Sequence, residues 1–121
     1  MIGTLFQTLG AAMMWIVATQ SCLAAELIMF RREGCPYCHA WDRAVRPVYG
    51  KSEVGLAVPL RMVDLDRDDP PNINLRRPIR YTPTFVLVED GREMGRIEGY
   101  PGEDFFWGLL DKLVRGLPSQ S

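Results

Sequence analysis

Four short segments of the chain have the hydrophobic patterning of β-strands. The first is Glu26–Phe30, an almost continuous apolar run, and the second lies within Leu56–Leu65, best placed at LRMVDL. The third, Thr84–Val88, is rich in β-branched and aromatic residues. The turn Glu89-Asp90-Gly91 then predicts a hairpin, in which Arg92–Glu98 pairs back as the fourth strand.

Two longer helices are predicted around these strands. The first begins near Cys35-Pro36, because proline is tolerated in a first helical turn, and it ends near Arg46, before Pro47. The second is the amphipathic segment Glu103–Arg115. Its apolar positions assign the inner side of this helix to Phe105, Phe106, Leu109, Leu110 and Leu113.

The long segment Asp64–Arg80 is predicted to be mainly loop. Pro70-Pro71 interrupts it, which leaves room for only a short helix after Asn72. The segment Gly99–Gly102 ends the sheet. The predicted order is therefore β-α-β-α-β-β-α, an α/β domain with a mixed four-stranded sheet flanked by helices.

Composition agrees with one small folded domain. The chain has 121 residues, of which 47% are hydrophobic and 24% are charged. A core can form from this length, but it will be small. The formal net charge is -1, so nothing in the charge balance points to nucleic acid.

The first 25 residues differ from the rest because they carry no charged side chain. All 14 basic and 15 acidic residues follow them, and Leu9–Thr19 is apolar over the length of a signal-peptide core. Small residues come next and allow cleavage after Ala24 or Ala25. We therefore expect residues 1–25 to be a signal peptide and residues 26–121 to be a periplasmic domain. An uncleaved inner-membrane anchor facing the periplasm is the alternative.

The cysteine count supports export. The chain has three cysteines, and Cys22 lies within the expected signal peptide. Its removal leaves the pair Cys35 and Cys38 and no stray thiol, which suits an oxidising compartment.

The strongest chemical signal is Cys35-Pro36-Tyr37-Cys38, placed after a strand and at the start of a helix. Disulfide exchange needs a thiolate nucleophile and a second thiol to resolve the mixed disulfide. At a helix N-terminus, Cys35 gains from unpaired amides and from the helix dipole, and such motifs lower a cysteine pKa from about 8.5 to about 3.5–7.5. Cys38, one turn further in, is expected to be more buried and to act as the resolving thiol.

Neighbouring residues should tune this site. Pro36 stiffens the turn, and Tyr37 is expected to face partners. His39 either stabilises the thiolate or is a polar residue on the exposed side of the helix. A metal site is not expected, because a structural zinc ion needs about four ligands and the mature chain offers two cysteines and one histidine.

A second element precedes the third strand at Thr82-Pro83. Proline cannot sit in the centre of a sheet, so Pro83 marks the entry of a strand. Together with the CxxC motif, this pattern resembles the thioredoxin superfamily and a thioredoxin-like fold. The resemblance implies that Pro83 is cis, that the backbone of Thr82 pairs with an extended substrate segment, and that Tyr100 borders the substrate groove.

Within that superfamily the chain is most similar to the SoxS-type periplasmic thioredoxins of bacterial sulfur-oxidation systems. The similarity is carried by MFRREGCPYCHAWDR and by RYTPTFVLVEDGREMGRIEGYPGEDFFWGLL. It implies a monomeric thiol–disulfide oxidoreductase with no cofactor beyond its redox-active disulfide. The implied partners are an exported protein with a disulfide or reactive cysteine, such as a sulfur-carrier protein, and a membrane thiol donor of the CcdA/DsbD kind.

The chain departs from related patterns at three places. Cytoplasmic thioredoxins carry an acid six residues before the nucleophile and a tryptophan just before it, where this chain has Met29 and Gly34. The CPYC motif also occurs in glutaredoxins, but the glutathione-binding Gly-Gly and Asp pattern has only a loose echo in residues 99–104. A disulfide-donating oxidase, a glutathione-linked reductase and a non-catalytic binding module therefore stay open as alternatives.

Charged residues give weaker signals. Five arginines are expected near the active face, where they either attract an acidic partner or are simply solvated: Arg31, Arg32, Arg76, Arg77 and Arg80. Asp64, Asp66 and Asp68 have the alternating spacing of a calcium loop. The glycine and glutamate that such a loop needs are replaced by Asp69 and Leu75, which argues against calcium.

Overall fold

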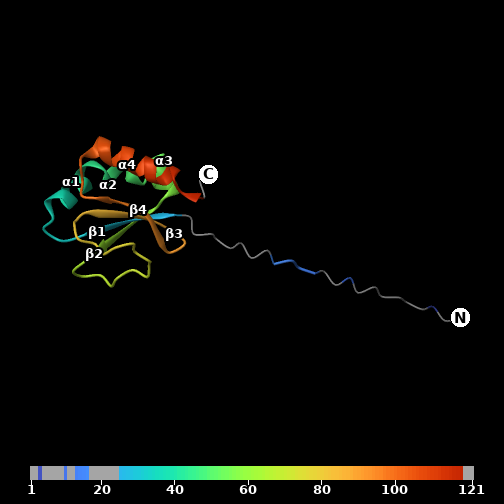
Figure 1. Ribbon diagram of the computed structural model, residues 1–121. Coiled ribbons are helices and arrows are strands. Elements are labelled where there is room, and N and C mark those ends of the chain that lie inside the picture. Colours follow the sequence, from blue (N-terminus) through green and yellow to red (C-terminus); the bar gives the residue numbers. More distant parts are fainter. Residues whose placement is uncertain (1–2, 4–9, 11–12, 17–24, 119–121) are drawn as a thin grey trace.

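The computed structural model describes residues 3, 10, 13–16 and 25–118, and its folded part is built on one mixed sheet (Figure 1). The strands lie in the order β2-β1-β3-β4. Their bounds are β1 (Glu26–Arg31), β2 (Leu60–Asp64), β3 (Thr84–Glu89) and β4 (Arg92–Glu98). β1 runs parallel to β2 and antiparallel to β3, and β3 and β4 form the antiparallel hairpin. The four predicted strands are confirmed.

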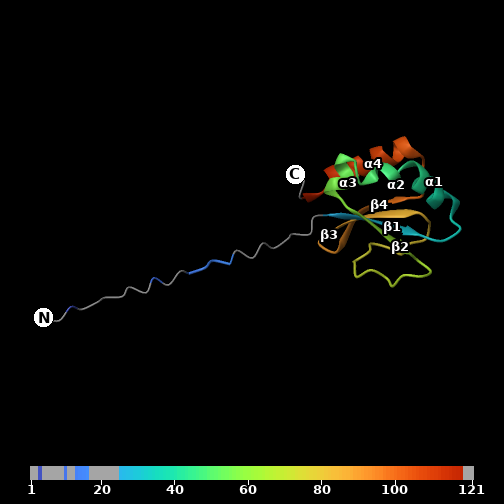
Figure 2. The same ribbon diagram turned by 180° about the vertical axis from the view of Figure 1, so that it is seen from behind.

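All the helices of the described residues lie on one face of this sheet (Figures 1 and 2). They are α1 (Pro36–Ala44), α2 (Arg46–Tyr49), α3 (Glu53–Ala57) and α4 (Glu103–Arg115). α1 ends slightly earlier than predicted. The short helices α2 and α3 were not predicted, although their starts carry ordinary signals. Pro47 stands in the first turn of α2, and the Ser52 hydroxyl oxygen accepts the Gly55 N–H of α3 at 3.0 Å.

The main core fills the space between the helices and the sheet. Its fully buried members come from strands and helices alike: Leu27, Met29, Phe85, Leu87, Trp41, Val45, Phe106 and Leu110. The prediction for α4 is wrong at Phe105 and Leu109, which are 70% and 41% exposed. Apolar residues occupy more than half of the circumference of this helix, so the pattern alone did not define which edge is buried.

The opposite face of the sheet is covered by the loop that joins β2 to β3, not by a helix (Figure 1). Four apolar side chains of that loop pack on the sheet: Leu65, Ile73, Leu75 and Ile79. The predicted short helix after Asn72 is therefore wrong. The backbone of Asn74 bonds instead to the hairpin, donating to the Gly91 carbonyl at 2.8 Å and accepting the Glu93 N–H at 3.0 Å.

A buried ion pair attaches this loop to β4. The Glu93 and Arg96 side chains are 1% and 5% exposed, and the guanidinium bonds both carboxylate oxygens at 2.6 and 2.7 Å. Arg96 also donates to the carbonyls of Arg77 and Pro78 at 2.8 and 3.3 Å. The Glu93 carboxylate accepts the backbone N–H of Arg76 at 3.0 Å. Three consecutive loop residues are thus bonded to one pair of side chains.

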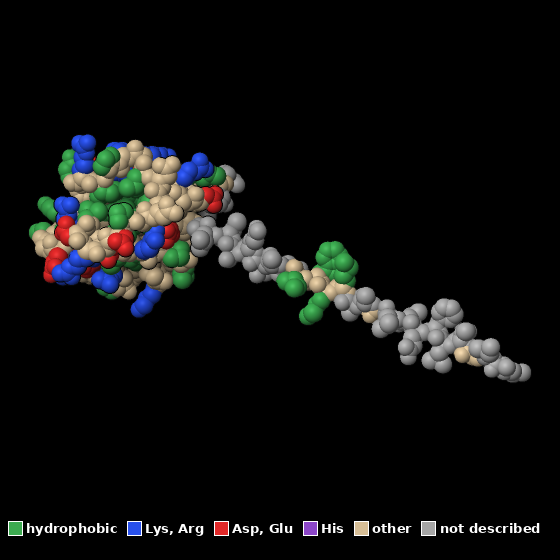
Figure 3. Space-filling model, turned by 90° about the horizontal axis from the view of Figure 1, so that it is seen from below, with side chains coloured by type: hydrophobic (Ala, Val, Ile, Leu, Met, Phe, Trp, Pro, Cys, Tyr) green, Lys and Arg blue, Asp and Glu red, His purple; other side chains and the backbone are tan. Residues whose placement is uncertain are grey.

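A β-bulge brings Glu93 and Arg96 onto the same face. In a regular strand, residues three apart point to opposite faces. Here the register between β3 and β4 shifts at Leu87/Val88, and both Met94 and Gly95 face the helix side. Met94 is the extra residue of the bulge, and because of it the Glu93 side chain points to the loop side, as Arg96 does. Figure 3 shows that side of the molecule, where basic and acidic side chains surround an apolar area.

The expected signal peptide, including Cys22, lies largely outside the described residues. The described residues 13–16 are exposed, and no helix in the described ranges has the length and apolar character to cross a membrane. Ala25 is different, because it is only 3% exposed and belongs to the main core.

Candidate active site

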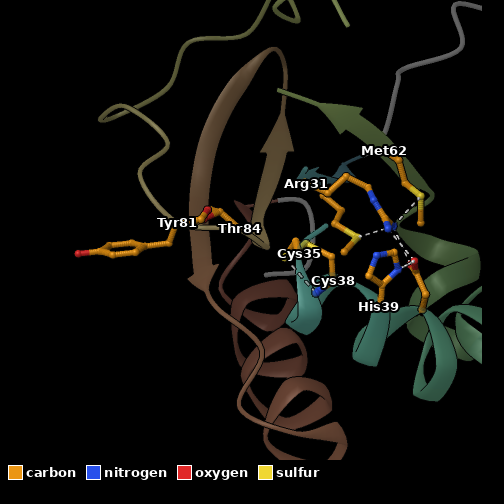
Figure 4. The surroundings of a disulfide bond; sticks show 9 residues. Arg31, Cys35, Cys38, His39, Met62, Tyr81 and Thr84 are labelled. Carbon is orange, nitrogen blue, oxygen red and sulfur yellow. Dashed lines mark hydrogen bonds and ion pairs between the residues drawn. A yellow bond between two sulfur atoms is a disulfide. The ribbon is translucent and has the colours of Figure 1, made fainter. Parts of the chain in front are cut away.

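The two cysteines of the CxxC motif form a disulfide at the N-terminus of α1 (Figure 4). Their Cα atoms are 5.2 Å apart. Cys35 is the N-cap residue, and its sulfur accepts the backbone N–H of Cys38 at 3.1 Å. Cys35 is 8% exposed and Cys38 is fully buried. The outer sulfur is therefore the one that another protein can reach.

The local sequence explains this placement. β1 ends at Arg31, and the turn that follows uses Gly34 at φ 78°, a left-handed conformation that favours glycine. Pro36 then occupies the first position of α1. No acidic residue stands in the first turn of α1, so the helix dipole and free amides there can favour a negative sulfur.

The segment before β3 lies at the same end of the sheet. Thr84 pairs with Phe30, which lies near the end of β1 from which the chain continues to the disulfide. The Thr82–Pro83 peptide bond is cis. The cis geometry implied by the superfamily resemblance is thus confirmed. The Pro83 carbonyl accepts the Gly99 N–H at 2.7 Å. Within residues 25–118, neither backbone group of Thr82 has a hydrogen-bond partner.

A partly buried ion pair lies on the other side of the disulfide from Tyr81 and Thr84 (Figure 4). The Arg31 guanidinium donates to both oxygens of Asp42 at 2.7 Å, and their side chains are 15% and 20% exposed. Burial opposes ionisation of Asp42, but the Arg31 hydrogen bonds together with nearby positive charges, chiefly that of Arg31, outweigh burial and lower the pKa of this carboxyl. The bond to Asp42 likewise raises the pKa of Arg31.

Sequence reasoning missed Asp42, although it stands four residues after Cys38 on the same helix, a spacing that places side chains on one face. The Arg31 guanidinium also contacts the sulfurs of Met29 and Met62 at 3.9 and 3.7 Å. His39 is 52% exposed, and its Nδ1 is 4.0 Å from Asp42. The His39 ring therefore lies beside the Asp42 carboxylate.

The two predicted site tyrosines differ in how far they are exposed. Tyr37 is 64% exposed beside the disulfide. Tyr100 is half-buried against Phe106, with ring centroids 6.4 Å apart, and burial together with nearby acidic residues raises its pKa. Trp107 is half-buried and stacks on Tyr49.

The aspartates of the possible calcium loop form hydrogen bonds within their own turn. The Asp64 carboxylate accepts the Asp66 N–H at 2.8 Å, and the Asp68 carboxylate accepts the Asp64 N–H at 2.7 Å. Within the described ranges, no group of three or more His, Cys, Asp or Glu side chains is arranged to hold a metal ion.

Comparisons with known proteins place this geometry in context. Residues 24–113 match the family model of a thioredoxin-like domain. The crystal structure of the periplasmic thioredoxin SoxS from Paracoccus pantotrophus, in its reduced form, is 44% identical with a TM-score of 0.70; the match covers 74% of this chain and 95% of SoxS. No curated protein matches the chain.

Two more distant structures share the fold. A thioredoxin from Thermus thermophilus is 23% identical with a TM-score of 0.56, over 80% of this chain and 79% of that one. A thioredoxin-fold protein from Helicobacter pylori is 18% identical with a TM-score of 0.61, over 76% of this chain and 70% of that one.

Proposed function

This chain belongs to the thioredoxin-like family and is a thiol–disulfide oxidoreductase, and we propose that it works as a reductase in the cell envelope. The observation that carries the proposal is the asymmetry of the cysteine pair. Cys35 caps the helix and reaches the surface, whereas Cys38 is fully buried one turn further in. That arrangement suits one attacking and one resolving sulfur.

The proposed reaction starts from the reduced pair. The Cys35 thiolate attacks a sulfur of the partner disulfide, a new S–S bond forms, and the other partner sulfur leaves as a thiolate. Cys38, once deprotonated, attacks the Cys35 sulfur and releases the second partner thiol. Two electrons pass from the enzyme dithiol to the partner, and the Cys35–Cys38 disulfide remains. The Cys38 N–H that bonds the Cys35 sulfur at 3.1 Å supports the ionised nucleophile.

The free backbone groups of Thr82 supply the proposed docking edge. An extended partner segment can pair with them as an added strand and bring its disulfide to Cys35. The similarity to the periplasmic thioredoxin SoxS supports a periplasmic location. The partner in this proposal is an exported protein with a reactive cysteine, such as a sulfur-carrier protein. In this proposal a membrane thiol donor of the CcdA/DsbD kind returns the disulfide to its dithiol form.

The charge-free N-terminal segment acts as a signal peptide in this proposal. Ala25 packs in the core, so cleavage after Ala24, which keeps Ala25, fits the domain better than cleavage after Ala25. The mass of the exported protein tests this: we expect a chain that begins at Ala25. An intact N-terminus would support the membrane-anchor alternative instead.

Covalent trapping in the native envelope tests the assigned roles. A Cys38→Ser variant should accumulate mixed disulfides with its partners through Cys35, because the resolving thiol is absent. The matched control is Cys35→Ser, which should trap little. If Cys35→Ser traps equally well and Cys38→Ser traps nothing, the roles are reversed. A reduction potential near the strongly oxidising end would favour the oxidase alternative.

A further inference from the structure

The structure separates the five arginines expected near the active face into members with and without an acidic partner. Arg31 pairs with Asp42. Three others have acidic neighbours: Arg32 lies 3.4 Å from Asp66, Arg77 lies 2.6 Å from Glu98, and Arg76 interacts electrostatically with Glu93. Of the five, only Arg80 has no acidic partner among residues 25–118.

Arg80 is also held close to the proposed docking edge. It is exposed and precedes Thr82 by two residues, so it lies within about 7 Å of that residue along the backbone. Tyr81 between them is 61% exposed, and its side chain points away from the disulfide (Figure 4). The Thr84 hydroxyl donates to the Tyr81 carbonyl at 2.6 Å, which fixes the backbone on the far side of Arg80.

The chain before Arg80 is fixed as well. The Arg96 guanidinium bonds the carbonyls of Arg77 and Pro78, and Ile79 packs against the sheet. An unpaired cation on a fixed segment loses little conformational freedom when it binds, apart from that of its own side chain.

We infer that Arg80 is a specificity-determining residue, which receives a carboxylate of the partner segment that pairs with Thr82. This inference rests on the proposed reductase function. The partner is identified by its chemistry as an extended segment with an acidic side chain two or three residues from its disulfide-bonded cysteine. The overall charge of the chain is -1. A preference for acidic partners therefore comes from the site and not from a general attraction.

Peptide disulfides of defined sequence test the inference. The probes are self-linked dimers of a short peptide with one cysteine and with Glu, Gln or Lys placed two residues before or after it. The measurement is the second-order rate constant for their reduction by the pre-reduced protein. An exposed ion pair predicts that the Glu peptide reacts about two- to five-fold faster than the Gln peptide, on one side of the cysteine. The advantage should shrink in high salt.

Arg80→Gln and Arg92→Gln change the net charge by the same amount, so comparing them separates a local effect from a general one. Arg80→Gln should remove the advantage of the Glu peptide, and Arg80→Glu should favour the Lys peptide. Arg92→Gln is the matched control, because Arg92 is exposed at the hairpin end of the sheet, opposite the disulfide end. It should leave the Glu-to-Gln ratio unchanged.

The outcomes distinguish this inference from the function on which it rests. Failure of the unmodified protein to reduce any of the peptides would overturn the reductase proposal and the role of Arg80 with it. Normal reduction of the Gln peptide, with the same Glu-to-Gln ratio in the unmodified protein and in Arg80→Gln, would overturn only the role of Arg80. An equal loss of the ratio in Arg92→Gln would assign the preference to net charge, which also overturns it.

Discussion

Replacing Arg96 with methionine should destabilise the domain by about 3–5 kcal/mol at pH 7, because it removes the hydrogen-bonded ion-pair partner of the buried Glu93 carboxylate. Two features of the structure favour a loss of stability near the upper end of this range. Both side chains are almost completely buried, and the guanidinium makes two bonds to the carboxylate and two to loop carbonyls. Urea unfolding of the unmodified protein and of Arg96→Met measures the difference.

The loss should depend on pH in a defined direction. Burial raises the pKa of Glu93, but the hydrogen bonds and positive charges of Arg96 and Arg76 together outweigh burial and hold the pKa below its usual value. The unmodified protein therefore gains stability from this carboxylate above the unfolded pKa of about 4.3, and loses that gain as pH falls through the lower folded pKa. In Arg96→Met, only the backbone N–H and the charge of Arg76 still oppose the effect of burial, so the carboxyl takes up a proton at higher pH than in the unmodified protein. The penalty should shrink between pH 7 and pH 4.

Two controls make the test specific. Arg115→Met removes an exposed arginine, 79% accessible, from its pair with Asp111, and should cost less than about 0.5 kcal/mol. The double variant Glu93→Leu/Arg96→Met removes both buried charges and should recover much of the stability lost in the single variant. A loss below about 1 kcal/mol at pH 7, or a loss that stays constant down to pH 4, would refute the reasoning.

Three further changes test other parts of the structure. Asp42→Asn removes the negative charge that neutralises Arg31 beside the disulfide, so the pKa of the Cys35 thiol should fall. The pH dependence of Cys35 alkylation measures this pKa, and an unchanged or higher value would contradict the prediction. Phe105→Ser should change the free energy of unfolding by less than about 0.5 kcal/mol, whereas Phe106→Ala should cost about 3–5 kcal/mol. Gly95→Ala would place a new Cβ atom 2.6 Å from a side-chain carbon of α4, and we expect a loss of about 1–2 kcal/mol in urea unfolding, since that flexible side chain can move.

Local signals were sufficient for the sheet and for the cysteine pair. β1 and β3 are short, nearly continuous apolar runs, as expected for strands that are buried on both faces. The hairpin is defined by Asp90 and Gly91, both at positive φ. The position of Cys35 as a helix cap follows from a strand, a glycine turn and a proline in fixed order. Each of these features depends on residues within a few positions of one another, which a sequence displays directly.

Features that depend on distant segments could not be predicted in this way. The burial of Phe106 instead of Phe105 depends on the direction in which α4 lies over the sheet, and the pattern of that helix alone does not contain this information. The bond between Arg31 and Asp42 joins a strand to a helix across eleven positions. The ion pair of Glu93 with Arg96 depends on a bulge. The isolated glycine at position 95 is a local sign of a bulge within the strand, but it does not define which side chains the bulge brings together.

The two faces of the sheet are therefore stabilised by different forces, and this bears on the site. On the helix side, burial of large apolar groups such as Trp41 and Phe106 positions α1 and its cysteines, and this contribution changes little with pH or salt. On the loop side, the apolar contacts are fewer, and the backbone that leads to Thr82 is bonded to a single buried ion pair. Acid or loss of one charge should thus loosen the docking edge before it disturbs the disulfide itself. The cysteines would then still react with small disulfides after selection among protein partners has been lost.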